Sequence, residues 1–265
     1  MKDIFKWLLG VSAILVLFAA TGNAADLSID EIVHRANLAS YYGGNDGRAE
    51  VAMTIKDAQG RERSREFVIL RRDVTDGGDQ QFYVYFEKPS DVRKMVFMVH
   101  KHVDGNDDRW LYLPALDLVK RIAASDKRTS FVGSHFFYED VSGRGEDEDL
   151  HELVETTDTA YVLKNIPKDP ESVEFASYTV WIDKNSFMPL KAEYMDVQGN
   201  IYRRVEALQV EDIQGIPTVT ESRVMDLTGG GETVSVFSNI TYDIGLDESI
   251  FSERYLRRAP REVRR

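Results

Sequence analysis

The chain of 265 residues contains no cysteine. Disulfide bridges and thiolate metal sites are therefore excluded, whichever redox compartment the protein occupies. Two glycine signatures are also missing. No Gly-x-Ser-x-Gly element marks a serine-hydrolase nucleophile, and Gly229-Gly230-Gly231 lacks the lysine and the helix of a phosphate-binding loop. These absences lead us to expect neither a bound nucleotide nor any other cofactor.

Residues capable of bond-breaking chemistry occur, but not in catalytic arrangements. Ser134 is followed directly by His135, and adjacent side chains on an extended chain point apart. Glu139 and Asp140 are a carboxylate pair in a chain with 45 acidic residues, so they carry little information as a glycosidase pair. A hydrolase is the least favoured function class, and we expect a protein that is not an enzyme.

The histidines give only a weak metal pattern. His100 and His102 stand two residues apart on an expected strand, so they share a face, but a third ligand is not evident. Residues 104–108 begin like a calcium loop, yet Arg109 stands where that loop needs glycine and Ala115 where it needs a bidentate glutamate. We expect two unrelated histidines, a tight turn and no metal site.

Acidic residues outnumber basic ones, and the formal net charge is −12. A net acidic chain argues against nucleic acid as a partner. The final residues 254–265 differ, because they hold six arginines against the single Glu262. Such a tail can meet anionic lipid or an acidic partner, but we expect it to be solvated and mobile.

The N-terminus has the pattern of a secretory signal peptide. Lys2 and Lys6 flank an apolar run over residues 7–20, and Gly22 and Ala24 suit a cut after Ala24. The apolar run is short for a membrane anchor, which is the alternative reading. We expect residues 1–24 to be removed and the rest to reach the periplasm. No cysteine follows the apolar run, so we expect no lipid anchor.

Residues 28–44 predict a helix. Ser28 and Glu31 fit a capping box, apolar residues from Ile29 to Ala39 recur at helical spacing, and Gly43-Gly44 ends the pattern. From residue 48 onward the period changes to two, as in Val51 and Met53. Asp-x-Gln-Gly recurs at 57–60, 196–199 and 212–215, where it suits short hairpin turns.

Further strands are expected at residues 66–71, 81–87, 95–101, 108–113, 118–122, 160–165, 177–183, 190–195, 202–210, 218–226 and 233–242, with a closing helix at 247–256. The acidic residues 146–149 read as an exposed loop. No strand–helix alternation appears, so the prediction is an α+β, mainly antiparallel meander forming a single domain over residues 25–265. From the pattern alone, a sandwich and a rolled sheet both stay open.

Apolar residues supply the remaining signal. Met95 and Phe97 alternate on one expected strand, and Trp110 and Tyr112 alternate on another. Four more aromatic residues sit in a segment without a regular period: Phe131, Phe136, Phe137 and Tyr138. Such residues either form ordinary core or line a cavity for acyl chains, where methionine repacks around variable ligands. We take these eight as the predicted ligand-binding residues.

The same region carries a family resemblance. Trp110–Leu116 (WLYLPAL), Val119–Ile122 (VKRI) and the SFVGS-x-F-x-YED run up to Asp140, with the weaker VWIDKNSFMPLKAEY ending at Tyr194, resemble the outer-membrane lipoprotein-sorting protein family of LolA/LolB-like periplasmic carriers. The resemblance implies a curved half-barrel with an N-terminal helix and a lid segment, residues 131–140, over its concave face. His135 stands where this family is expected to have aspartate.

The resulting hypothesis is a non-enzymatic periplasmic carrier of lipid or lipoprotein acyl chains. Because nothing resembles a nucleotide-driven motor, cargo must pass between partners of graded affinity. The family resemblance implies an inner-membrane exporter of hydrophobic compounds or an outer-membrane acceptor as partner, with the carrier itself a monomer. The alternative is a periplasmic binding or scaffold module that contacts other envelope proteins through a sheet edge and an aromatic patch.

Overall fold

The computed structural model describes residues 27–264. The predicted signal peptide, residues 1–24, therefore lies outside the described residues. In the part of the chain that is described, no helix has both the length and the apolar character needed to cross a membrane.

One antiparallel sheet of thirteen strands dominates this part of the chain. The helices and strands are α1 (Ile29–Tyr41), β1 (Asp46–Asp57), β2 (Glu62–Asp73), β3 (Gln80–Lys88), β4 (Val96–Lys101), β5 (Asp108–Leu113), β6 (Leu118–Ile122), α2 (Tyr138–Ser142), β7 (Asp149–Thr156), β8 (Ala160–Pro167), β9 (Ser177–Asp183), β10 (Pro189–Met195), β11 (Ile201–Ile213), β12 (Ile216–Asp226), β13 (Gly231–Tyr242) and α3 (Arg254–Arg257).

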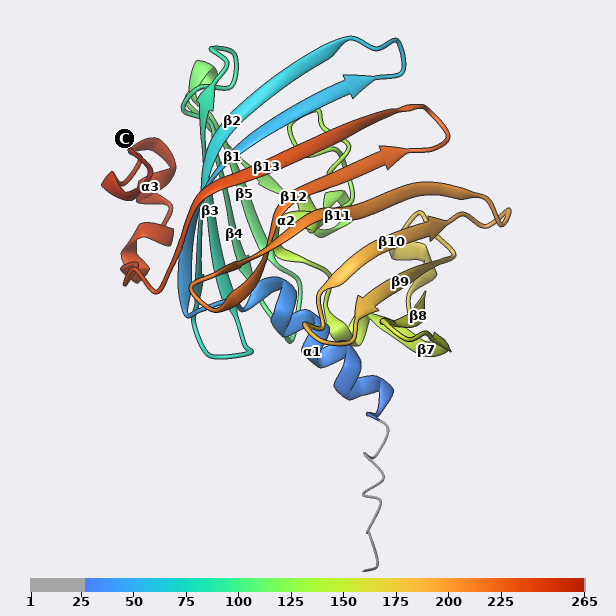
Figure 1. The fold of residues 1–265 in the computed structure, drawn as a ribbon. Coiled ribbons are helices and arrows are strands. Elements are labelled where there is room, and N and C mark those ends of the chain that lie inside the picture. Colours follow the sequence, from blue (N-terminus) through green and yellow to red (C-terminus); the bar gives the residue numbers. More distant parts are fainter. Residues whose placement is uncertain (1–26, 265) are drawn as a thin grey trace, which may run out of the picture.

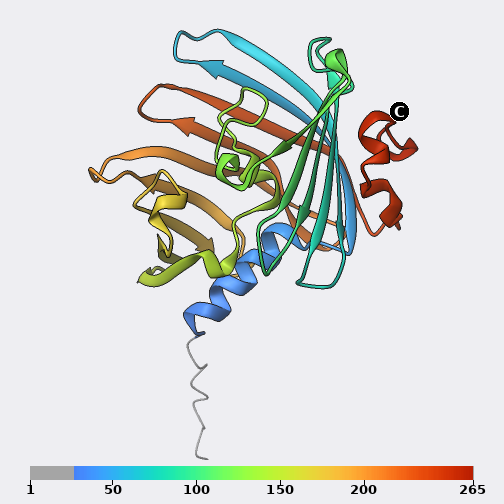
Figure 2. The same ribbon diagram turned by 180° about the vertical axis from the view of Figure 1, so that it is seen from behind.

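The order of strands in the sheet is β6-β5-β4-β3-β2-β1-β13-β12-β11-β10-β9-β8-β7. Strands that follow one another are neighbours except β6 and β7, which become the two edges because β1 pairs with β13 in the middle. The sheet is strongly curved and not closed (Figure 1). The connection from β6 to β7, residues 123–148, passes across the concave face and carries α2 (Figure 2). The predicted half-barrel is confirmed.

Alternation of apolar and polar residues produces the strands as expected. Val51, Met53 and Ile55 of β1 are buried while the residues between them are exposed. In the turn between β1 and β2, the Asp57 carboxylate accepts a hydrogen bond from the Gln59 amide at 3.0 Å, and Gly60 has φ +77°. The turn at 196–199 is built in the same way. In the turn at 212–215 the Asp212 carboxylate instead accepts from the Gly215 amide at 2.8 Å, and both Gln214 and Gly215 have positive φ.

Strands β2 to β5 are covered on both faces. On the concave face their side chains pack with Phe131 and Tyr138 of the β6–β7 connection, which are buried in that core. On the convex face they pack with the C-terminal segment, residues 246–263. The C-terminal segment lies outside the curve of the sheet in both views, while α1 and α2 lie on its inner side (Figures 1 and 2).

The C-terminal residues correct one expectation. Leu256 is 1% exposed and Val263 is 0% exposed, and Arg48 donates a hydrogen bond to the Glu262 carbonyl at 3.0 Å. The expected mobile tail is thus wrong up to Arg264, because its apolar residues complete a core. The closing helix is also shorter than expected, since it is divided into a 3-10 turn at Glu248–Phe251 and α3.

Helix α1 begins as the sequence indicated, since Ser28 accepts a hydrogen bond from the Glu31 amide at 3.2 Å. Its buried residues Ile32 and Ala36 pack against Leu163 of β8 and Ile182 of β9. Strand β7 was not expected. Six of its eight residues are exposed at a sheet edge, so it lacks the apolar alternation by which strands are recognised.

Candidate functional site

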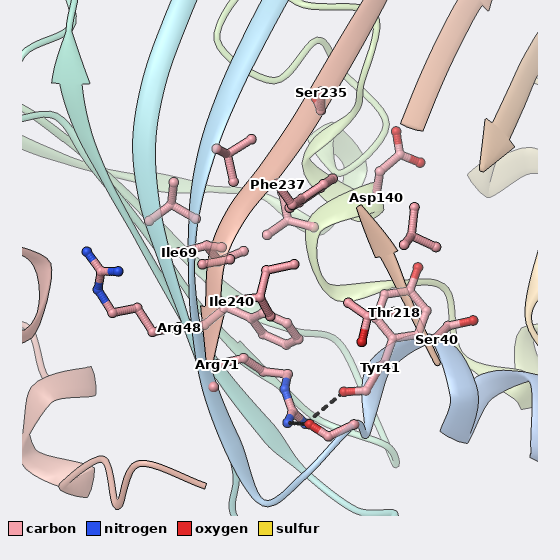
Figure 3. A pocket seen from close by; sticks show the side chains of 18 of the residues that line it. Ser40, Tyr41, Arg48, Ile69, Arg71, Asp140, Thr218, Ser235, Phe237 and Ile240 are labelled. Carbon is pink, nitrogen blue, oxygen red and sulfur yellow. Dashed lines mark hydrogen bonds between the residues drawn. The ribbon is translucent and has the colours of Figure 1, made fainter. Parts of the chain in front are cut away.

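A cavity lies on the concave face, among the sheet, the C-terminal end of α1 and the β6–β7 connection. It has two adjoining parts of about 290 and 410 Å³, here called the apolar part and the polar part. Seven residues line both parts and so connect them: Ser40, Tyr41, Phe136, Asp140, Met188, Val219 and Phe237. Figure 3 shows Tyr41, Asp140, Phe237 and Ile240 around the apolar part.

Hydrophobic side chains from strands distant in sequence form the wall of the apolar part. β1 to β3 contribute Met53, Ile69 and Val84, while β13 contributes Phe237 and Ile240. These strands are brought together by the pairing of β1 with β13, in which Val51 lies opposite Phe237. An apolar wall of this kind can bind a hydrocarbon chain without hydrogen bonds or ion pairs.

The end of α1 is fixed to the cavity wall by Arg71 of β2. Its guanidinium donates to the carbonyls of Tyr41, Gly43 and Gly44 at 2.8, 2.5 and 2.7 Å. These carbonyls lie at and just beyond the end of the helix, where backbone acceptors lack helical partners and a cation is favourable. The clamp holds Tyr41 at the junction of the two parts (Figure 3).

The acidic and basic side chains that line the polar part all have partners. Glu139 accepts from Lys127 at 3.0 Å and from Arg128 at 2.5 Å, and Arg144 contacts Asp149 at 2.9 Å. Asp140 is paired with Arg203. The other two are Glu146, bonded to Asn37 at 2.5 Å, and His151, bonded to Asn165 at 2.7 Å.

This cluster shifts the pKa of Glu139. Burial by itself raises the pKa of a carboxyl group, but the charges of Arg128, Lys127 and Arg144 outweigh that effect and lower the pKa of Glu139 to about 2. The side chain is therefore ionised at neutral pH, although it is buried.

Two phenol groups border the polar part without such pairing. Tyr41 comes from α1 and Tyr194 from β10, and within residues 27–264 neither hydroxyl has a hydrogen-bond partner. Burial is the main cause that raises the pKa of both phenols, so both are neutral donors at physiological pH. The polar part therefore offers two uncharged hydroxyl donors, beside charged side chains that already have partners.

The structure places the eight predicted ligand-binding residues in four environments. Phe131 lines the apolar part, and Phe136 lines both parts. Met95, Phe97 and Tyr138 belong to the packed concave core behind that wall. Contact with cargo remains a prediction for all of them.

Phe137 lies outside the cavity lining. Its ring is sandwiched between the guanidinium groups of Arg128 at 5.0 Å and Arg203 at 4.4 Å. Through these cation–π contacts, the Phe137 ring packs within the ion-pair cluster and not in the cavity. Its expected place in the cavity is wrong.

Trp110 and Tyr112 are on the convex face, so placing them in the cavity was also wrong. Trp110 pairs with Met98 and Tyr112 with Val96, one residue out of step with the concave Phe97. Because side chains alternate along a strand, both face the C-terminal segment. Sequence alternation identified the pair but did not indicate which face each strand turns inward.

Cavity residues from β12, β13 and α1 were missed by the sequence analysis. Val219, Phe237 and Tyr41 fall in elements that were predicted correctly, but nothing in their local pattern distinguishes a cavity wall from ordinary core. The alternation in residues 233–242 was the recognisable local signal for Phe237. Whether such a residue lines a cavity or forms core depends on the pairing of β13 with β1, which is a long-range contact.

The remaining candidate side chains have structural partners. Ser134 Oγ donates to the Phe131 carbonyl at 2.7 Å, and His135 Nδ1 lies 2.8 Å from Thr233 Oγ1, fastening the connection to β13. His100 contacts the Phe251 carbonyl at 2.6 Å, whereas His102 contacts Asp79 at 3.0 Å. Across residues 27–264 no group of three or more metal-ligating side chains is assembled.

Comparisons with known proteins agree with this architecture. A DUF1329 family protein from Desulfovibrio piger is 29% identical, with a TM-score of 0.78 over 86% of this chain and 97% of that one. An outer membrane lipoprotein-sorting protein domain from Vibrio parahaemolyticus is 28% identical, with a TM-score of 0.77 over 85% and 97%. A LolA superfamily protein from Nitrosomonas europaea shares the fold at 20% identity, with a TM-score of 0.67 over 86% and 99%.

No curated protein matches the chain. A family model with the description "Uncharacterized protein" matches residues 78–258, which is more than half of the chain. The family resemblance found in the sequence is thus confirmed by a family model and by two solved relatives of similar sequence and fold. The chain belongs to the DUF1329 family and has the LolA-superfamily fold.

Proposed function

We propose that this protein is a non-enzymatic periplasmic carrier that binds lipid or lipoprotein acyl chains in the concave cavity and passes them to a membrane acceptor. The observation that carries the proposal is the apolar part, which lies beneath α1 and the β6–β7 connection on an open, curved sheet. The Vibrio relative, described as a lipoprotein-sorting domain, supports the same class of cargo.

The size and lining of the cavity suit hydrocarbon. Its two parts measure about 290 and 410 Å³, and small-molecule sites have volumes of roughly 300–1,000 Å³. Each methylene group taken out of water contributes about 0.8 kcal/mol. A single acyl chain therefore supplies enough free energy for binding with few polar contacts.

Release needs an acceptor of higher affinity, because no motif for nucleotide-driven transfer was found in the sequence. The signal-peptide pattern of residues 1–24 supports a periplasmic location for the mature chain. There an inner-membrane exporter of hydrophobic compounds would act as donor and the outer membrane as acceptor. The carrier is proposed to act as a monomer.

Native mass spectrometry of the mature protein purified from periplasm tests this proposal. We expect a bound lipid at one-to-one stoichiometry, identified after extraction. Val219→Trp should abolish that bound mass, because Val219 lines both parts and the larger indole would fill their junction. Val236→Trp is the matched control, since Val236 is an exposed residue on the same sheet that does not line the cavity.

An empty wild-type protein that also refuses fluorescent fatty acids and lipopeptides would reject the carrier. That result would favour a binding or scaffold module, and one observation on the edge strand supports this alternative. The edge strand β7 exposes Leu150 by 56% and Val154 by 53%, and an open edge with apolar side chains is a template for pairing with another chain.

A further inference from the structure

The hydroxyls of Tyr41 and Tyr194 are unpaired donors at the cavity. Both residues line the polar part, and Tyr41 also lines the apolar part. The described side-chain atoms that are fully covered and unpaired come from Arg65, Gln80, Arg109, Arg203 and Ser235. The two phenol oxygens are not among them, so neither is fully covered, and both residues line the polar part, where each hydroxyl can donate to a bound group.

These two phenols belong to one site. Both residues line the polar part, and burial, followed by the nearby carboxylates of Asp140 and Glu139, raises the pKa of both phenols. Asp140 lines both parts of the cavity beside them. A single ligand group at the junction is thus within the surroundings of both hydroxyls.

The charged groups that line the cavity beside them do not favour an anionic ligand. Asp140 is neutralised by Arg203 and also accepts from the Phe137 amide at 2.6 Å. Glu139 is neutralised by Lys127 and Arg128. With these charges already compensated, a ligand carboxylate finds no free cation among the side chains that line the cavity.

Arg203 has unused donors, because its Nε and Nη1 have no partner. Both atoms are fully covered, and the guanidinium lies 4.4 Å from the ring centre of Phe137 and 5.0 Å from that of Tyr194. Arg203 does not line either part of the cavity. The guanidinium of Arg203 therefore contacts the aromatic rings of Phe137 and Tyr194, and it is not available to bind an anionic ligand in the cavity.

We infer that the cargo is an amphiphile whose neutral hydrogen-bond acceptor, an ester or amide carbonyl, accepts from Tyr41 and Tyr194 while its hydrocarbon chain fills the apolar part. The inference rests on the proposed carrier function and narrows its ligand class. A pure hydrocarbon would displace water from both hydroxyls without replacing the hydrogen bonds, and a carboxylate would be desolvated without a cation.

The physical consequence is a preference that can be measured. One hydrogen bond of ordinary strength changes affinity roughly three- to tenfold. A site that donates hydrogen bonds to a ligand also discriminates against the analogue that lacks the acceptor. We therefore expect an ester to bind at least about tenfold more tightly than a hydrocarbon of the same length.

The test compares methyl myristate, myristate and pentadecane as competitors of the neutral fluorescent probe N-phenyl-1-naphthylamine on the mature protein. Wild type should bind methyl myristate most tightly. In the double variant Tyr41→Phe/Tyr194→Phe the affinity for methyl myristate should fall about tenfold or more, while pentadecane binds as before or better. Retained pentadecane binding shows that the variant cavity is intact. Should the double variant not fold, the two single variants give the same comparison.

Tyr112→Phe is the matched control, since it removes a phenol hydroxyl on the convex face and should leave all three affinities unchanged. Equal affinity of wild type for the ester and the hydrocarbon would overturn the inference, as would tightest binding of myristate or an undiminished ester preference in the double variant. Each of those results leaves the carrier function standing. Wild type that binds none of the three ligands would overturn the carrier function and the inference together.

Discussion

At the scale of single residues, Glu139 holds the polar cluster together. Its carboxylate contacts Lys127 at 3.0 Å, Arg128 at 2.5 Å and Arg144 at 3.5 Å. It belongs to α2, within the connection that crosses the concave face. All three cations belong to the same connection, so this single buried anion cross-links the segment that roofs the cavity.

This arrangement predicts a pH-dependent stability. The pKa of Glu139 is lowered from 4.5 to about 2 in the folded state. A lowered folded pKa means that its stabilisation is present above pH 4.5 and is lost as pH falls toward 2. The expected loss in the free energy of unfolding is on the order of 3 kcal/mol. It is measured as the difference between the free energies of urea unfolding at about pH 5 and at about pH 2 to 3.

Glu139→Gln is the matched variant for that measurement. At neutral pH it should lower the free energy of unfolding by about 3 kcal/mol, because buried cations lose their shared anion. Other carboxylates still titrate in the variant, so the informative quantity is the difference between the two pH profiles. Parallel profiles of wild type and variant between pH 5 and the acid limit would contradict the assigned role of Glu139.

At the scale of elements, the C-terminal segment is a structural part of the sheet. Leu246, Ile250, Phe251, Leu256 and Val263 cover the convex face of β2 to β5. The Tyr83 hydroxyl of β3 donates to the Tyr255 carbonyl at 2.7 Å. The apolar side chains of this segment pack against the sheet, and its basic residues lie between them in the sequence.

Leu256→Ala should therefore lower the free energy of unfolding by about 2–5 kcal/mol, because it leaves a cavity in a closed core. Leu116→Ala is its control, since Leu116 is 70% exposed and its truncation should change stability by less than about 0.5 kcal/mol. Chemical denaturation of the three proteins gives the comparison. Equal stabilities would mean that the C-terminal segment does not contribute to the core in solution.

At the scale of the whole molecule, the two halves of the sheet differ in how they are covered. Strands β2 to β5 are enclosed by the concave core and the C-terminal segment. The far end of β11 is different, because residues 208–211 are exposed and pair only with β12. Stability should follow this difference, since opening of exposed hairpin ends costs less than opening of an enclosed core.

Hydrogen exchange followed by mass spectrometry tests that expectation. Peptides containing Tyr83 and Val84 of β3 should exchange only through global unfolding, whereas peptides from residues 208–213 should exchange faster by local opening. A ligand bound in the cavity should slow exchange near Val219 and Phe237, which line it. Uniform protection across both peptides would show that the far end of β11 is covered in solution.

Local patterns in the chain were enough to predict most of the helices and strands and the class of fold. Alternation at Val51 and Met53, the Asp-x-Gln-Gly turns and the capping box at Ser28 are local patterns, and local backbone chemistry suffices to read them. It could not reveal β7, whose exposed residues carry no alternation. The family motifs supplied the half-barrel, which periodicity alone left open against a sandwich.

The position of the site depends on long-range packing, which local patterns do not contain. A strand alternates identically whichever face turns inward, so Trp110 and Phe97 looked equivalent until strand register put them on opposite faces. Pairing of β1 with β13 brought Phe237 to the cavity, and the crossing of the β6–β7 connection placed Phe136 and Asp140 beside Tyr41. Those contacts join residues far apart in the chain, and closing such distances depends on the packing of the entire sheet.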